Sequence, residues 1–445
     1  MNLIRQKFTP LIIILLSGIV GGFLTYLIGI NPLFWLVPVL AALLAAILNK
    51  PRIGIILLVF SVFLSPRFTV GMLAYERALD LRIDDFLIMI ICLVWLCRAY
   101  LTGQLRLNTG HIGIPMAIYV AICAISTCVG ILFGWVVPIR AVFYFGKEME
   151  FFLLFLTIAT AVKDRVGARE VFTAFLICTL IQAVWMNYQL FSGHPFGIYG
   201  AQGFFEQGVV ASGASCLFGL AVLFAVFAIG NKTIEQAVWY CILIGILMVG
   251  MLGVGSRTTL AGFIGVMLAL VIWLGWRILP RFPTVTLAIV LVIVGVFTVS
   301  KLHPYALHRI LFMPAIEHSY TGRMIGWGAY LALFLKNPLL GLGKSVTPMY
   351  VGATCADNNY VRLLAEVGIL GTVAFFWLVI KASRISWYRS RRASNRLAKV
   401  TGLAFVCCTV GMLLMSLFAD VFMVVRVAGP YWLLGGLALG SWVDT

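Results

Sequence analysis

Three arginines and one aspartate are the residues of this chain whose types together suit a chemical reaction: Arg140, Arg257, Arg323 and Asp357. A guanidinium group binds phosphate or diphosphate in a bidentate way. A carboxylate can take a proton from a hydroxyl group as long as it stays ionised. The combination predicts a site that holds a diphosphate and moves one proton. Asp357 also suits the N-cap of the helix that follows it, so its role stays open at this point.

Other charged residues lie close to the same long apolar runs. Arg362 and Glu366 are four residues apart and can neutralise each other on one helix face. Glu148 and Glu150 can pair with Lys147 or with an arginine one or two turns earlier. If the apolar runs span a membrane, such charges must be paired or must face water, because an isolated charge is costly there. These residues therefore indicate a polar cavity.

The apolar runs identify the class of protein. Apolar residues make up 62% of the 445 residues and charged residues 11%, against about 45–50% and about 25% in ordinary globular chains. A soluble core cannot bury that much hydrocarbon, whereas a bilayer can. The sequence predicts an all-α polytopic membrane protein. Intrinsic disorder, a secreted disulfide scaffold and a soluble nucleic-acid binder are excluded.

We expect about 12–14 transmembrane helices, because two of the apolar runs are short and one of them can be re-entrant. The fourteen runs are 9–31, 33–48, 53–64, 86–97, 112–135, 141–162, 171–190, 213–230, 237–254, 258–276, 284–300, 358–380, 401–419 and 429–443. They divide the chain into a bundle of about 11 helices in residues 1–300, an extracytoplasmic loop in residues 301–357 and C-terminal transmembrane helices in residues 358–445.

The distribution of charge predicts the orientation. With fourteen spans, the side that holds both termini carries 19 of the 32 basic residues and four of the 15 acids. The positive-inside rule places this side in the cytoplasm. Topology thus explains the net charge of +17, and no nucleic-acid partner is needed. The basic loop 381–399 is expected to contact anionic lipid or a cytoplasmic partner.

The loop 301–357 is the connection long enough to build structure of its own, and it holds three of the five histidines. Residues 323–335 have helical periodicity and predict a helix that lies at or dips into the membrane interface. The proline and glycines of residues 337–343 end this helix. The ten cysteines form no C-x-x-C pair, and the chain lacks a G-x-x-x-x-G-K-[ST] motif. We therefore expect neither a metal nor another cofactor.

Three stretches resemble the bacterial O-antigen ligase and O-antigen polymerase family. They are Gly255-Ser256-Arg257 at the start of a span, Thr321–Gly343 (TGRMIGWGAYLALFLKNPLLGLG) and Asp357–Gly371 (DNNYVRLLAEVGILG). Their order also matches the family: a span that opens with Ser-Arg, one more span, the long loop, and the Asn-Tyr…Glu-x-Gly-x-x-Gly span. The resemblance covers roughly residues 250–380, whereas the first 200 residues match in hydropathy alone.

The resemblance implies a GT-C-like helical bundle and a metal-independent, inverting glycosyl transfer on the outer face of the cytoplasmic membrane. The donor is an oligosaccharide linked to undecaprenyl diphosphate, and the acceptor is a glycan. Arg257 and Arg323 fall on the family's two arginine positions, which hold the diphosphate leaving group, and Arg140 is a further candidate. Saccharide contacts or structural support are expected from a wider set: Asn358, Asn359, Tyr360, Arg362, Glu366, His308 and His318.

One departure from the family bears on the activity. In the ligases a histidine before the Asn of the last stretch is thought to act as the base, and Asp357 occupies that position here. A carboxylate can take this role. The Asp-Asn version looks more like a polymerase of polysaccharide repeat units than a ligase that transfers glycan to lipid A–core. The ligase remains an alternative, a lipid-linked oligosaccharide flippase is a further one, and binding of a chain-length regulator stays open.

Overall fold

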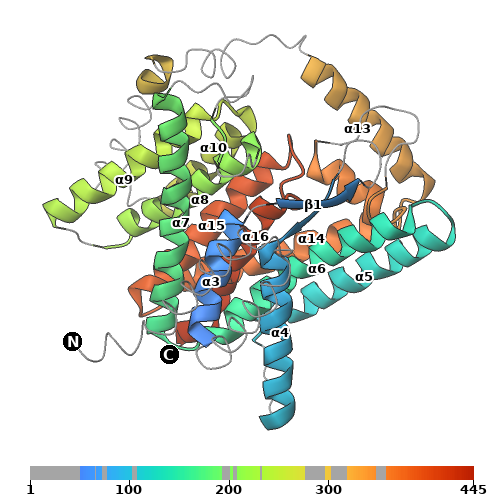
Figure 1. Cartoon of the computed structure of the whole chain (residues 1–445), viewed down its shortest axis with the longest axis horizontal. Helices are drawn as coiled ribbons and strands as arrows, with labels where there is room; N and C mark the ends of the chain where they lie inside the picture. The colour runs from blue at the N-terminus through green and yellow to red at the C-terminus, as the bar shows by residue number, and fades with distance from the viewer. Residues whose placement is uncertain are drawn as a thin grey trace, which may run out of the picture.

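The computed structural model of the protein describes residues 51–65, 67–72, 78–102, 108–192, 201–203, 208–230, 233–275, 296–301, 318–346 and 357–444. The spans expected at 9–31 and 33–48, and most of the span expected at 284–300, lie outside these residues. The described part is a bundle of helices, shown in Figure 1.

The main helices of the described residues follow the expected spans closely. They are α3 (Pro51–Leu64), α4 (Ile83–Thr102), α5 (Gly113–Leu132), α6 (Pro138–Ala161), α7 (Arg165–Phe191), α8 (Val209–Ala228), α9 (Ile234–Gly253), α10 (Arg257–Leu274), α13 (His318–Lys336), α14 (Asn359–Arg392), α15 (Arg396–Met415) and α16 (Val425–Leu439). α13 confirms the helix predicted at 323–335, and its position at a membrane interface stays a prediction. α14 runs further than the predicted span 358–380, because the basic residues near its C-terminal end continue the helix.

Seven of these helices are long and apolar enough to cross a membrane: α5, α7, α8, α9, α10, α14 and α15. The prediction of an all-α polytopic membrane protein is confirmed. α6 carries four charged residues, and two of them, Lys147 and Glu148, are buried.

The sequence did not predict a short hairpin before α4. Strands β1 (Arg67–Met72) and β2 (Ala78–Arg82) pair antiparallel, with Arg67 opposite Arg82. Arg82 also donates to the carbonyl of Val62 at 2.8 Å, and Ile83 N donates to Ser65 Oγ at 2.9 Å. The hairpin is thereby tied to the end of α3.

Side chains before several helices fix where the helices begin. Asp164, Thr233, Ser256, Asn358 and Asn395 each accept a hydrogen bond from a backbone N–H of the first turn that follows. Such an N-cap satisfies a donor that has no partner within the helix. These polar residues interrupt the apolar runs, so they also set the ends of the spans.

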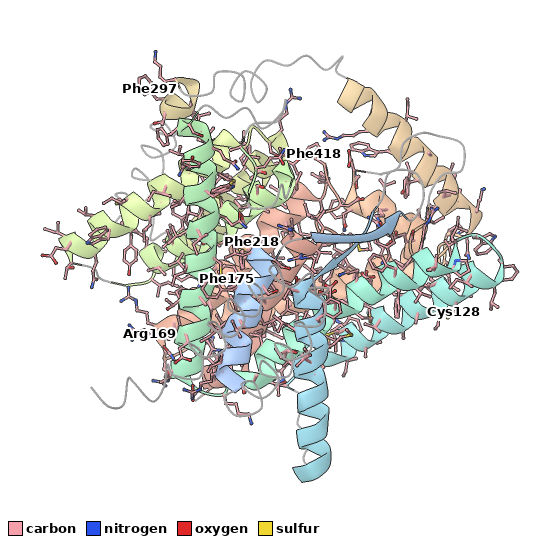
Figure 2. The ribbon with its side chains drawn as sticks, viewed as in Figure 1. Cys128, Arg169, Phe175, Phe218, Phe297 and Phe418 are labelled. Carbon is pink, nitrogen blue, oxygen red and sulfur yellow. The ribbon has the colours of Figure 1, made fainter. Side chains whose placement is uncertain are left out.

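α8 lies at the centre of the bundle. In its most apolar window 83% of the residues are buried, against 39% in α5 and α9. Phe175 of α7 and Phe218 of α8 are both fully buried, and both lie in the middle of the view in Figure 2. α5 keeps an apolar outer face that includes Ile118 and Ile125, as expected for a helix in contact with lipid.

Arginines cap helix ends at the side of the bundle predicted to be cytoplasmic. Arg389 is buried and donates to the last carbonyl groups of α16. Arg391 donates to the carbonyl of Trp273 at the end of α10, and Arg396 donates to that of Ile229 after α8 at 3.0 Å. Part of the charge of loop 381–399 is therefore used to satisfy helix C-termini within the protein.

The opposite ends of the helices meet around the residues that suit chemistry. Asn359 N donates to the carbonyl of Ser416 at 2.9 Å, which joins the start of α14 to the end of α15. Arg426 at the start of α16 donates to the carbonyl of Ser65 after α3. In Figure 2, Phe418 lies near this end, and Arg169 lies near the other.

Candidate active site

α14 is broken in its first third, at Gly368, and the break has a structural cause. Gly368 has φ +65° and ψ −169°, a backbone conformation that is essentially restricted to glycine. The segment 337–346, here called the strap, lies in this break. Leu342 N and Gly343 N donate to the carbonyls of Ala365 and Glu366, each at 2.9 Å. The strap thus takes the hydrogen bonds that the broken helix cannot make itself.

The part of α14 after the break donates back to the strap. Ile369 N donates to the carbonyl of Pro338 at 2.8 Å, and Leu370 N donates to that of Leu339 at 3.2 Å. Irregular backbone at membrane depth is tolerated where other parts of the protein satisfy it. The Asn-Pro-x-x-Gly-x-Gly stretch and the Glu-x-Gly-x-x-Gly stretch are therefore two halves of one backbone pairing.

The glycines of these two stretches allow the close approach. A Cβ atom on Gly341 would lie 2.5 Å from the carbonyl carbon of Glu366. A Cβ atom on Gly130 of α5 would lie 2.1 Å from the carbonyl oxygen of Leu342. Both distances are far inside van der Waals contact, so a side chain at either position would push the strap away.

The N-cap of α14 is Asn358. Its side-chain oxygen accepts from Tyr360 N at 3.0 Å and from Val361 N at 3.2 Å, and its Nδ2 donates to the carbonyl of Leu417. The alternative role of Asp357 as the cap of this helix is therefore wrong. Asp357 precedes the cap with φ +45°, in the left-handed region that few residues other than glycine adopt.

Arg323 and Asp357 are brought together. Arg323 Nε lies 3.5 Å from Asp357 Oδ2, and the two side chains are 31% and 46% exposed. Arg323 is in the second turn of α13, so the ion pair joins this helix to the start of α14. Both groups remain accessible to a ligand, and an exposed pair of this kind contributes only about 0–1 kcal/mol. A stronger anion could take the place of the carboxylate.

Arg257 lies at the same end of α15 as Asp357. It is the first residue of α10 and is exposed. A Cβ atom on Gly262 of α10 would meet the side chain of Met415 at the end of α15. The residues after Met415 in turn bind the start of α14, as described above. The N-termini of α10 and α14 therefore flank one end of α15.

Arg140 is in the first turn of α6 and is partly exposed. Its Nε atom is buried and has no hydrogen-bond partner among the described residues. The adjacent Ala141 packs in a small apolar cluster with Tyr330 of α13, two turns after Arg323. The first turn of α6, which contains Arg140, therefore lies near α13.

The predicted pair of Arg362 and Glu366 is confirmed. Arg362 Nε lies 2.9 Å from Glu366 Oε1, and its NH1 lies 3.0 Å from Asp420 Oδ2. All three side chains are largely buried, so Arg362 holds the start of α14 against the segment after α15. Removing one member of such a buried pair leaves the other charge without compensation.

Lys344 is the residue of this region that sequence reasoning missed. Its side chain is fully buried in the strap, with Nζ 2.7 Å from Glu148 Oε2 of α6 and 3.3 Å from Glu366 Oε2 of α14. Burial lowers the pKa of Lys344, but the two carboxylates outweigh this effect and hold the pKa above its ordinary value. The signal was one lysine within a glycine-rich stretch, and its partners are far away in the sequence.

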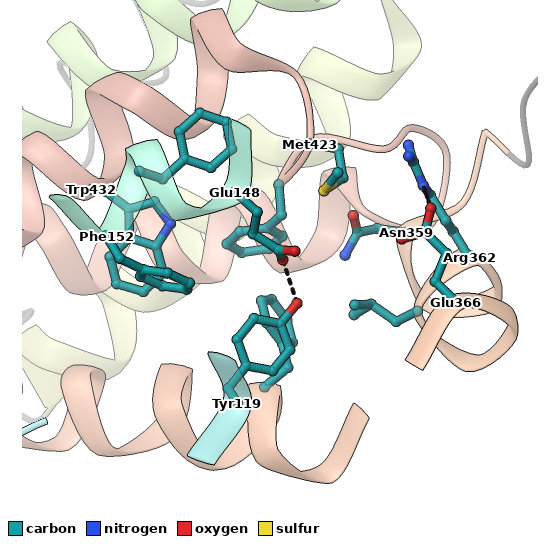
Figure 3. Close-up of a pocket in the computed structure, with 12 residues that line it drawn as sticks. Tyr119, Glu148, Phe152, Asn359, Arg362, Glu366, Met423 and Trp432 are labelled. Carbon is teal, nitrogen blue, oxygen red and sulfur yellow. Dashed lines mark hydrogen bonds and ion pairs between the residues drawn. The ribbon is translucent and has the colours of Figure 1, made fainter. Parts of the chain in front are cut away.

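A small cavity of about 10 Å³ lies beside this network. Figure 3 shows Glu148 near its centre with Tyr119 below and Asn359 to the right. The Tyr119 hydroxyl donates to Glu148 Oε1 at 2.5 Å. Asn359 is buried, and its Nδ2 has no partner among the described residues. The volume suits about one water molecule, which would bond to these groups.

A second group of charges lies at the start of α4. Asp84, Asp85 and Glu150 have carboxylate oxygens within 4.8 Å of one another. Lys147 Nζ lies 2.5 Å from Asp85 Oδ2 and 3.1 Å from Glu150 Oε2, which confirms the predicted pairing of Glu150. Arg82 Nε lies 3.0 Å from Asp84 Oδ1. Two protein cations, Arg82 and Lys147, thus pair with the three carboxylates.

Three candidates remain. Tyr360 donates its hydroxyl to the carbonyl of Leu413 at 2.5 Å and stacks on Phe376, which is a structural role. His318 is the first residue of α13. His308 lies outside the described residues.

The comparisons with known proteins bear on the same segments. Residues 242–376 match the family model described as O-Antigen ligase. This match includes Arg257, α13 with Arg323, the strap, Asp357 and the part of α14 that contains the break at Gly368, whereas Arg140 and Glu148 lie outside it. A search of curated proteins finds no match to this chain. The resemblance inferred from the three sequence stretches is confirmed.

Proposed function

We infer, because residues 242–376 match the family model described as O-Antigen ligase, that the chain is a glycosyltransferase of bacterial cell-surface polysaccharides. The proposed activity is that of a polymerase, which joins oligosaccharide units carried on undecaprenyl diphosphate. The pair of Arg323 and Asp357 is the observation that carries the proposal. It sets a phosphate-binding group beside a carboxylate that is not used as a helix cap.

The reaction needs one base and one group of residues that binds the leaving diphosphate. The acceptor sugar hydroxyl attacks the anomeric carbon of the donor, Asp357 takes the hydroxyl proton, and the bond to the carrier diphosphate breaks. In-line attack inverts the anomeric centre. Arg257 and Arg323 would stabilise the negative charge that develops on the leaving diphosphate, and loss of one such group typically costs about 10²–10³ in rate. Arg140 would add a third positive charge.

The ion pair of Arg323 and Asp357 also suggests that the donor binds before the acceptor loses its proton. Without donor, Arg323 holds Asp357 in a weak, partly exposed pair. A diphosphate offers the guanidinium two charged oxygens and would replace the carboxylate. Asp357 is then free to accept the acceptor's proton. Donor binding would thus prepare the base.

The outer face of the cytoplasmic membrane is the proposed place of reaction, with both termini in the cytoplasm. The multi-pass architecture and the segregation of basic helix caps to one end support this orientation. A lipid-linked donor would keep its tail among the membrane lipids while its diphosphate reaches the N-termini of α10 and α14. The energy comes from the activated donor.

The ligase is the second candidate, because the matching family model carries that description. Asp357 in place of the family's histidine favours the polymerase. Purified protein with a synthetic undecaprenyl-diphosphate repeat unit as sole substrate separates the two activities. A ladder of longer lipid-linked products that is lost in Asp357→Asn and Arg257→Ala would establish a polymerase. Arg169→Ala at the other end of the bundle is the control and should keep the ladder.

Two other outcomes would contradict the polymerase. Transfer that requires added lipid A–core would identify a ligase. An absence of both products, with carrier lipid crossing the bilayer of vesicles that contain the protein, would identify a flippase.

A further inference from the structure

We propose that Lys344 is a positioning residue that fixes the strap and, through it, the placement of Arg323. This rests on the proposed function for its catalytic consequence, although the structural consequence can be measured separately.

Lys344 joins three elements at one point. Its Nζ contacts Glu148 of α6 at 2.7 Å and Glu366 of α14 at 3.3 Å, and its backbone N–H donates to Thr127 Oγ1 of α5 at 3.4 Å. The next residue, Ser345, donates its N–H to Glu366 Oε1 at 3.1 Å. Because a charge without exposed surface requires paired partners, the strap has one position in which Lys344 is satisfied.

The strap packs against Tyr330 of α13. Leu342 and Val346 stand two residues before and after Lys344, and both are buried in a small apolar cluster with Tyr330 of α13. This cluster is separate from the main core of the bundle. The place of Tyr330 is therefore set by the strap and by the few residues of α5, α6 and α14 around it.

The position of Tyr330 sets the position of Arg323, because both residues belong to the same helix. The two residues are seven apart, which is two turns, so they lie on the same face of α13. A shift of the strap moves Tyr330, and the rigid helix transmits the shift to Arg323 and its contact with Asp357. A displacement of about 1 Å at a reacting centre can cost on the order of 10² in rate.

The test compares Lys344→Met with Lys344→Arg in the full chain in lipid nanodiscs. Lys336→Met is the matched control, because Lys336 is an exposed lysine at the end of α13. Hydrogen–deuterium exchange of residues 318–346 reports on the strap and α13, and exchange in α8 and α15 reports on the main core. Glycosyl transfer is measured on the same samples with a synthetic undecaprenyl-diphosphate repeat unit.

We expect Lys344→Met to raise exchange in residues 318–346, to leave exchange in α8 and α15 unchanged, and to lower kcat by about 10². Lys344→Arg should restore both readouts in part, and Lys336→Met should equal the wild type. If Lys344→Met does not fold, the double variant Lys344→Met/Glu148→Gln removes the uncompensated charge and should give the same local change.

Two results would overturn the proposal: unchanged exchange in residues 318–346, or exchange that rises equally in the main core. A third, loss of activity in which Lys344→Arg is no better than Lys344→Met, would also contradict it. If the wild type itself makes no product, the proposed function fails, and the exchange experiment still decides the structural role of Lys344.

Discussion

Replacing Gly368 with alanine tests the pairing of the strap with α14. The conformation of this residue, φ +65° and ψ −169°, is strained for any side chain by about 1–3 kcal/mol. The added Cβ would also lie 2.3 Å from the carbonyl oxygen of Leu339 and 2.6 Å from Gly341 N, both backbone atoms. Overpacking against a fixed backbone adds about 1–3 kcal/mol. We therefore expect Gly368→Ala to destabilise the protein by about 2–6 kcal/mol.

Alanine substitutions at two other glycines separate the cost of backbone strain from the cost of overpacking. Gly134 has φ +68° with nothing within 4 Å of its Cβ position, so Gly134→Ala meets the backbone strain alone. Gly328 lies within α13 with open space around it, and alanine should be neutral or stabilising there by up to about 1 kcal/mol. The expected order of stability is Gly328→Ala, then Gly134→Ala, then Gly368→Ala.

The assay is the apparent Tm of the purified variants in one detergent, with glycosyl transfer measured at a temperature well below each Tm. Gly368→Ala should lower the Tm most and should lose activity even where it stays folded, because the strap must move away from α14. An apparent Tm for Gly368→Ala equal to that of Gly134→Ala would refute the close contact between the strap and α14.

Further outcomes follow from the buried polar groups. Tyr119→Phe removes the hydrogen bond to Glu148 and should cost about 1.5–3 kcal/mol, measured as a lower Tm, whereas no change would mean that the bond is not formed. Arg389→Gln removes the cap of α16 and should lower the Tm more than Arg384→Gln, an exposed neighbour on the same helix; equal effects would contradict the cap. Since the pKa of Lys344 is raised, the stability from its ion pairs is complete below its ordinary pKa of 10.5 and is lost only as pH rises through the higher folded value. The difference in apparent Tm between the wild type and Lys344→Met should therefore stay constant between about pH 7 and 10.

Hydropathy and polar punctuation were sufficient to locate most of the helices. Spans such as 237–254 and 258–276 agree with α9 and α10 within a few residues, because a helix in lipid must be long, apolar and bounded by polar caps. The pair of Arg362 and Glu366 was also predictable, since residues four apart on a helix are neighbours.

The contacts between distant segments could not be predicted in the same way. Lys344 reaches Glu148, which is almost 200 positions earlier, and hydropathy contains no information on such a pairing. The break at Gly368 was hidden within an apolar run, because the partner that fills it is another segment of the chain. The sequence offered Asp357 as a possible cap of α14, and the cap is the next residue, Asn358. An error of one residue is usual at a helix boundary.

The roles of Asp357 as base and Arg323 as diphosphate-binding residue are tested by measuring donor binding and sugar transfer separately in Arg323→Gln and Asp357→Asn. We expect Arg323→Gln to weaken binding of the undecaprenyl-diphosphate donor. We expect Asp357→Asn to bind the donor at least as tightly as the wild type, because the carboxylate no longer competes for Arg323, yet to transfer no sugar. Transfer at the wild-type rate by Asp357→Asn, or unchanged donor binding by Arg323→Gln, would contradict the assignment of base and diphosphate-binding residue.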